Sequence, residues 1–154
     1  MNSIDPRTVL FRAVGGGGAI ALMIWLSKIS GVPLMWIPFA TSIVMVMGSP
    51  EAPPAQPMRI LGGHMVCATA GIACTMLLGF DIWIAALAIA VAIALMHAMD
   101  VFHPPAGITP VIIVMNKASP LFILSPVLVG AVLLIVYALL FNRLTGENWP
   151  ENWR

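Results

Sequence analysis

The chain has 154 residues, of which 60% are hydrophobic, and its seven basic and six acidic side chains give a net charge of +1. A soluble domain of this length carries charged residues at roughly a quarter of its positions, so this composition excludes an ordinary soluble fold. The near-neutral charge also argues against nucleic acid as a partner. We therefore expect an all-α polytopic membrane protein in contact with the lipid bilayer.

Six apolar segments follow one another along the chain and predict six helices. Four of them approach the length of about 20 residues that a helix needs to cross the hydrocarbon core. These full transmembrane segments are residues 11–29, 60–80, 82–99 and 122–141. Two segments, residues 36–48 and 106–116, are too short to cross, and each follows a proline-bearing stretch, so we expect half-helices there. No cleavage pattern follows the first segment, so we do not expect it to be a removed signal peptide.

Small and aromatic residues mark where helices meet and end. The fourth segment carries a stripe of alanines on which another helix can pack closely. The stripe consists of Ala86, Ala90, Ala94 and Ala98. The glycine run 15–18 permits similar contact or gives a flexible start to the first helix. Tryptophans near segment ends and in the C-terminal tail fit aromatic belts at the membrane interface. They are Trp25, Trp36, Trp83, Trp149 and Trp153.

The sequence predicts one transmembrane domain, residues 1–154, with a weak internal repeat. A shift of 68 residues aligns the two short segments, with three identities between residues 41–47 and 109–115. This alignment predicts halves at residues 8–80 and 81–145, each with three segments and the second inverted relative to the first. The alternative is four full helices with two re-entrant hairpins.

Basic residues favour the inverted repeat with a cytoplasmic N-terminus, and we expect a bacterial inner membrane. In that topology the residues on the cytoplasmic side are Arg7, Arg12, Arg59, Arg143 and Arg154. Lys28 and Lys117 then lie outside. The hairpin topology would move Arg59 to the outside. Four basic residues would then lie on the cytoplasmic side and three outside, a distribution that the positive-inside rule favours less.

Two polar, proline-rich stretches, residues 48–64 and 97–110, interrupt the apolar pattern. They resemble the two signature regions of the HPP family of integral membrane proteins. The matching residues are His103-Pro104-Pro105, which gives the family its name, and the run Ser49-Pro50, Gln56-Pro57, Arg59 and Gly63-His64. The resemblance covers roughly the second to sixth segments. It implies nitrite transport, to which plant and cyanobacterial members of the family are linked.

Half-helices also suggest anion transport on physical grounds. A helix that begins inside the membrane presents unpaired N–H groups and the positive end of its dipole. In an inverted repeat the two starts would meet near the midplane, where broken helices of transporters bind ions. We therefore expect a transporter or channel for a small inorganic anion such as nitrite. The expected substrate-binding residues are His103, Pro104, Pro105, Ala106, Gly107, Thr109, Thr41 and Ser42. The alternative is that both are kinked packing helices.

Further polar residues are candidates for the pathway or for gating. They are Asp100, His97, His64, Arg59, Gln56 and Ser49. His103 either lends a proton or gates the path by titrating near neutral pH, or it only caps the preceding helix. Asp100 either orients His103 or ends the fourth segment. Arg59 is a topology anchor or a vestibule charge, and Gln56 is expected to bond the broken backbone nearby.

The sequence leaves two other functional classes of protein open. His97, Asp100 and His103 are spaced three apart, which raises an intramembrane metal-dependent enzyme, but a third strong ligand and a nucleophile are missing. We therefore expect no metal, no cofactor and no enzymatic activity. The other rival is a non-transporting membrane subunit. A chain of this size encloses little pore by itself, and with the alanine stripe this favours a homo-oligomer.

Overall fold

The computed structural model describes residues 5–34 and 37–153, and in these ranges it contains helices and no strand. The six α-helices are α1 Pro6–Ser30, α2 Ile37–Gly48, α3 Pro57–Leu78, α4 Ile82–Ala98, α5 Thr109–Met115 and α6 Val129–Thr145. Three short 3₁₀ turns, η1 Pro53–Ala55, η2 Pro104–Ile108 and η3 Pro120–Ile123, and one π turn, η4 Leu124–Leu128, join them. The predicted all-helical class is confirmed. Trp36 lies outside the described residues.

Three helical stretches in the described part are long and apolar enough to cross a membrane. They are Pro6–Ser30, Pro57–Leu78 and Pro120–Thr145, the last of which joins η3, η4 and α6. The fourth predicted crossing, α4, has 17 residues. At 1.5 Å per residue it spans about 25 Å, which is less than the roughly 30 Å of the hydrocarbon core. The two segments expected to be short are short.

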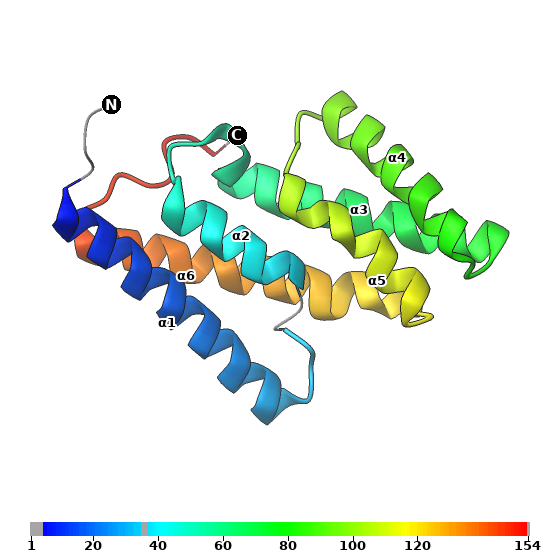
Figure 1. The fold of residues 1–154 in the computed structure, drawn as a ribbon, viewed down its shortest axis with the longest axis horizontal. Coiled ribbons are helices and arrows are strands. Elements are labelled where there is room, and N and C mark those ends of the chain that lie inside the picture. The colour runs from blue at the N-terminus through cyan, green and yellow to red at the C-terminus, as the bar shows by residue number, and fades with distance from the viewer. Residues whose placement is uncertain (1–4, 35–36, 154) are drawn as a thin grey trace.

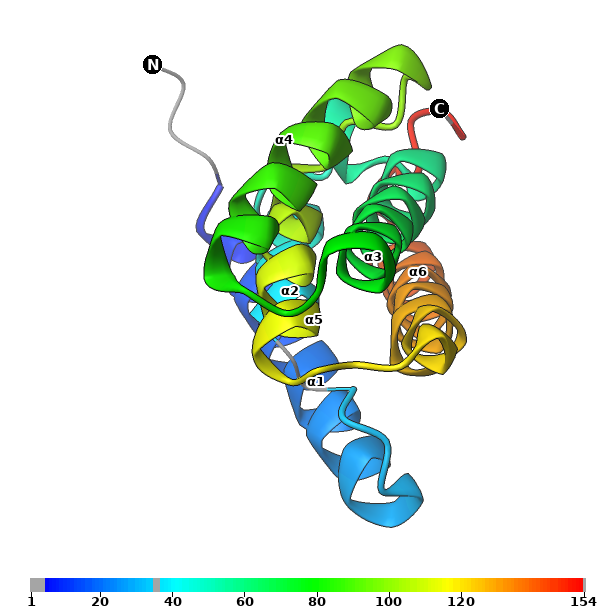
Figure 2. The same ribbon diagram turned by 90° about the vertical axis from the view of Figure 1, so that its right-hand side faces the viewer.

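The helices pack in two groups around a central pair. α3 and α6 lie side by side, α1 contacts α2 and α6, and α4 contacts α3 and α5 (Figure 2). α2 and α5 begin near the centre and run toward opposite ends of the molecule (Figure 1). The start of α1 and the end of α6 share one end of the bundle, where the guanidinium of Arg12 lies 3.9 Å from the carboxylate of Glu147.

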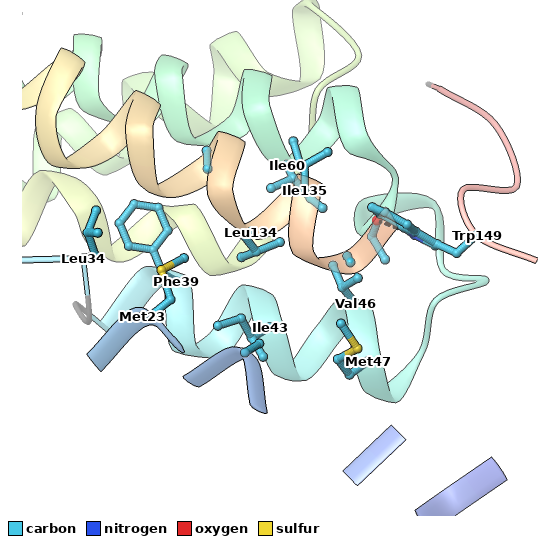
Figure 3. Close-up of a cluster of buried hydrophobic side chains, with 14 residues drawn as sticks. Met23, Leu34, Phe39, Ile43, Val46, Met47, Ile60, Leu134, Ile135 and Trp149 are labelled. Carbon is cyan, nitrogen blue, oxygen red and sulfur yellow. Dashed lines mark hydrogen bonds between the residues drawn. The ribbon is translucent and has the colours of Figure 1, made fainter. Parts of the chain in front are cut away.

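The larger apolar core lies where α1, α2, α3 and α6 meet (Figure 3). Met23, Phe39, Ile43 and Leu134 are buried in it. Trp149 of the C-terminal tail is buried in the same core, and its indole N–H donates to the carbonyl of Ala55 at 3.1 Å. The expectation that Trp149 belongs to an interfacial belt is therefore wrong, because the tail folds back onto the η1 turn. Trp25, Trp83 and Trp153 are exposed, as such a belt requires.

Small residues carry two of the helix contacts. Tyr137 of α6 lies against the glycine run of α1, and its hydroxyl donates to the carbonyl of Gly15 at 3.0 Å. Close contact at these glycines is confirmed. The buried face of α4 consists of Ala85, Ala88, Ala92 and Met96. The predicted stripe is exposed instead, so within this chain the neighbouring helices pack on the adjacent row of alanines.

Candidate functional site

Two glycines of α3 bring the HPP motif onto that helix. A Cβ added to Gly63 would lie 2.5 Å from Cβ of His103, and one added to Gly62 would lie 2.6 Å from a methyl carbon of Val101. Real Cβ atoms are never this close to a neighbour, so only glycine admits the chain here. As a result His103 lies beside His64, with ring centroids 5.2 Å apart.

Ser42 of α2 joins the two histidines into one buried cluster. Its Oγ lies 2.9 Å from Nε2 of His64 and 2.7 Å from Nε2 of His103. All three side chains have no exposed surface. They come from α2, α3 and the turn before η2, so the cluster ties three segments together. We call Ser42, His64 and His103 the Ser–His–His cluster.

His103 bridges two elements and caps neither. Its Nδ1 lies 2.7 Å from the carbonyl oxygen of Pro54 in η1. A carbonyl only accepts, so Nδ1 carries a hydrogen and donates. No side-chain cap bond is present at the start of η2. The preceding helix, α4, has Met99 as its C-cap, and both ring nitrogens of His103 bond to other elements, so the alternative that His103 caps that helix is wrong.

The start of η2 does not offer the backbone donors that we expected. Pro104 and Pro105 have no N–H, and the N–H of Ala106 donates to the carbonyl of His103 at 3.1 Å. The first turn of a half-helix contributes to anion binding mainly through free N–H groups. In this part of the site the available donors are therefore side chains rather than the first N–H groups of η2.

An open groove of about 760 Å³ runs beside the cluster, between α2 and η2. The predicted substrate-binding residues Thr41, Pro104 and Pro105 line it together with Ser49. Thr41 also donates to the carbonyl of Pro38 at 3.0 Å. The other five predicted substrate-binding residues do not line this groove: Ser42 and His103 belong to the cluster, Ala106 and Thr109 are buried, and Gly107 is half-buried with free space around its Cα.

The structure separates the remaining predicted polar residues from the cluster. Asp100 receives the guanidinium of Arg59 at 2.8 Å, so it does not orient His103; it lies in the turn that ends α4. His97 is exposed and stacks on Phe102 at 4.3 Å. His97, Asp100 and His103 therefore do not converge, and no three potential metal-ligating side chains gather within residues 5–34 and 37–153.

Gln56 holds the loop after α2, as expected. It is buried, and its amide nitrogen donates to the carbonyl of Pro50 at 2.9 Å. Its amide oxygen accepts from the backbone N–H of Glu151 at 3.1 Å. Sequence reasoning did not single out Pro54 or Phe39, whose ring lies 5.0 Å from that of His64. Nothing in the local sequence marks the Pro54 carbonyl as an acceptor for a ring 49 residues away.

Comparisons with known proteins agree with the motif. The family description "HPP, transmembrane region" matches residues 1–150. The chain belongs to the HPP family. Two proteins of Dictyostelium discoideum described as transmembrane proteins are similar to this HPP chain, at 33% identity over 125 residues and 34% over 124. Each alignment covers 75% of the chain but only 44% and 40% of the relatives, so the chain spans less than half their length. No solved structure matches it.

Proposed function

We propose that this HPP-family chain is a transporter or channel for a small inorganic anion, with nitrite as the candidate substrate. The observation that carries the proposal is the Ser–His–His cluster, buried between α2, α3 and the turn before η2. Polar and ionisable side chains inside a membrane protein are costly and usually belong to the path of an ion or substrate.

The chemistry of the cluster suits a monovalent anion. A serine hydroxyl and imidazole N–H groups donate hydrogen bonds to an oxyanion without placing a permanent charge in the site, and a bound anion would replace partners that these donors have in the structure. Two residues that line the groove, Thr41 and Pro104, are the chain neighbours of Ser42 and His103. Because the three side chains are fully buried, an anion reaches them only after the segments that cover them move. We therefore assign the structure to an occluded state.

The helix contacts support the inverted repeat that the proposal assumes. If α1, α2 and α3 correspond to α4, α5 and α6, each contact of one half has a counterpart in the other. Thus α1 on α2 matches α4 on α5, and α2 on α6 matches α5 on α3. Every segment then crosses or enters the membrane, with both short helices beginning near its middle.

Orientation and assembly belong to the same proposal. Arg12 contacts Glu147, Arg143 is in the last turn of α6, and Arg59 follows Met58, whose N–H donates to the carbonyl of Trp153 in the C-terminal tail. Lys28 is in the last turn of α1, at the other end of that helix from Arg12. This distribution supports a cytoplasmic N-terminus in a bacterial inner membrane. We further propose a homo-oligomer that carries out no enzymatic reaction. Cysteine labelling from either side and mass measurement in detergent test the two points.

The test of function is anion uptake into proteoliposomes that hold the purified protein. Initial rates for nitrite are compared with those for nitrate, formate and chloride, and with the His103→Ala variant. We expect saturable nitrite uptake that His103→Ala lowers by roughly 100-fold, as removing a positioned donor or acid does. If nitrite uptake is no faster than in empty vesicles, nitrite is not the substrate. Equal nitrite uptake rates in the wild type and His103→Ala would show that the cluster is not part of the transport pathway.

A further inference from the structure

A small enclosed cavity adjoins the Ser–His–His cluster on the side away from η1. It is lined by Pro38, Phe39, His64, Thr109, Ile112, Phe122, Pro126 and Val127. Two polar atoms of its lining, Nδ1 of His64 and Oγ1 of Thr109, are buried and have no hydrogen-bond partner in the described part of the chain. His64 is 0% and Thr109 2% exposed. Buried polar atoms are rarely left without a partner, so the pair points to a missing ligand.

The size of the cavity identifies this ligand as water. The space open to the centre of a water-sized sphere is about 10 Å³. A single water needs about 10–15 Å³ by this measure and two or more polar partners. A nitrite ion, with three heavy atoms, does not fit. The cavity therefore has room for one water, and His64 and Thr109 of its lining offer that water two polar partners.

The Ser42 hydroxyl has two acceptors, the Pro38 carbonyl at 2.8 Å and Nε2 of His103 at 2.7 Å, and the position of its one hydrogen sets the direction of the bonds in the cluster. Nδ1 of His103 carries a hydrogen because it faces the Pro54 carbonyl, so Nε2 of the neutral ring is bare and accepts the hydroxyl hydrogen of Ser42 when that hydrogen turns from Pro38 to His103. The Ser42 oxygen then accepts from Nε2–H of His64. Nδ1 of His64 is then bare, and it can accept from a water in the cavity that His64 lines. With the Ser42 hydrogen on the His103 side, the donors of all four groups point one way, from the water to Pro54.

We propose that this chain loads one proton onto His103 for each anion carried, with the cavity water as the donor. The inference rests on the transport proposed above. A proton that reaches the water from solvent binds Nδ1 of His64, whose Nε2 hydrogen passes to Ser42 Oγ. The former hydroxyl hydrogen of Ser42 passes to Nε2 of His103. His103 becomes an imidazolium, Ser42 now donates to Nε2 of His64, and His64 donates from Nδ1 to a neutral water. Only N–H and O–H bonds change, and the cluster gains one positive charge.

The surroundings explain why loading needs an anion. α2, α5 and the 120–141 segment contribute no charged side chain. From α3 and the turn before η2, Arg59 and Asp100 face one another at 2.8 Å and neutralise each other. In the loop with η1, Glu51 lies 3.7 Å from Arg12. A buried imidazolium without a counter-charge is strongly disfavoured. A monovalent anion supplies that charge, so the loaded step is electroneutral.

Proteoliposomes with an internal pH dye and a nitrite gradient test the coupling. Nitrous acid crosses lipid by itself, so rates are taken above those of empty vesicles. We expect one proton taken up per nitrite and a rate that does not change when a potassium diffusion potential is imposed. Nitrite uptake that follows the potential without proton uptake would overturn the coupling and leave the proposed function standing. Absence of nitrite uptake would overturn both.

Nitrogen-15 NMR of labelled protein tests the water site without any substrate. We expect His64 to carry its hydrogen on Nε2, with a bare, hydrogen-bonded Nδ1 that shows magnetisation exchange with water. Thr109→Val keeps the side-chain shape but removes the second partner of the water, and it should abolish that exchange, whereas Thr109→Ser should retain it. A hydrogen on Nδ1 of His64, or the same exchange in Thr109→Val, would contradict the proposed chain.

Discussion

The close packing of α3 against the HPP motif makes Gly63→Ala an informative substitution. The new Cβ would lie 2.5 Å from Cβ of His103 and 3.1 Å from the carbonyl oxygen of Val101. Carbon atoms in contact are about 3.5–4.0 Å apart, so the chain at His103 must move by about 1 Å. Such over-packing costs about 1–3 kcal/mol, and we expect an unfolding free energy lower by about 2 kcal/mol in detergent.

The same displacement should impair transport more than stability. The bond between Ser42 and His103 is 2.7 Å long and would stretch beyond about 3.5 Å, where it no longer counts as a hydrogen bond. A misplacement of about 1 Å in a working site commonly costs on the order of 100-fold in rate, so nitrite uptake by correctly inserted protein should fall by at least about tenfold.

The matched control for this substitution is Gly17→Ala, because a Cβ at Gly17 meets nothing within 4 Å. Alanine is favoured over glycine inside a helix by about 1 kcal/mol, so this variant should be as stable as the wild type or slightly more so. Chemical unfolding and uptake are measured on both variants at equal reconstitution. If Gly63→Ala behaves like Gly17→Ala in both assays, the close approach of His103 to α3 is wrong.

Two further substitutions test parts of the frame around the site. Gln56→Leu leaves the Pro50 carbonyl and the Glu151 N–H without the partners that Gln56 gives them. We therefore expect the free energy of unfolding to fall by about 1–3 kcal/mol and hydrogen exchange in residues 149–153 to become faster. Unchanged exchange in those residues would show that Gln56 does not hold the tail. Arg59→Ala removes an ion pair whose aspartate, Asp100, is 66% exposed. Exposed pairs contribute about 0–1 kcal/mol, so its unfolding midpoint should hardly move, and a larger loss would mean that the pair is desolvated.

The sequence predicted most of the helices because each is a long apolar run that ends at proline or glycine. The start of α3 at Pro57 and of η2 at Pro104 follow from the fixed φ and missing N–H of proline. α4 is shorter than the roughly 20 residues that a membrane-spanning helix needs, because its apolar run ends at the turn near Asp100. Length and composition set these boundaries without reference to distant contacts.

The residues of the site were predicted from the sequence, but their contacts with one another were not. Ser42, His64 and His103 were all named, yet nothing local indicated that they share one cluster, since the three lie 22 and 39 residues apart. The pairing depends on how α3 crosses the turn before η2, which Gly62 and Gly63 decide through space that only the fold reveals. Asp100 was placed beside His103 by sequence proximity, but the turn carries its carboxylate to Arg59 instead.

The most direct test of the account compares nitrite uptake in Ser42→Ala and Thr75→Val. Ser42 Oγ contacts both buried histidines, whereas the buried hydroxyl of Thr75 donates only to the carbonyl of Ile72 in its own helix, at 2.9 Å. Each variant loses one buried hydroxyl and little volume. The account predicts uptake lowered by at least about tenfold in Ser42→Ala and unchanged in Thr75→Val, because only Ser42 belongs to the transport site. Equal uptake in the two variants would contradict it.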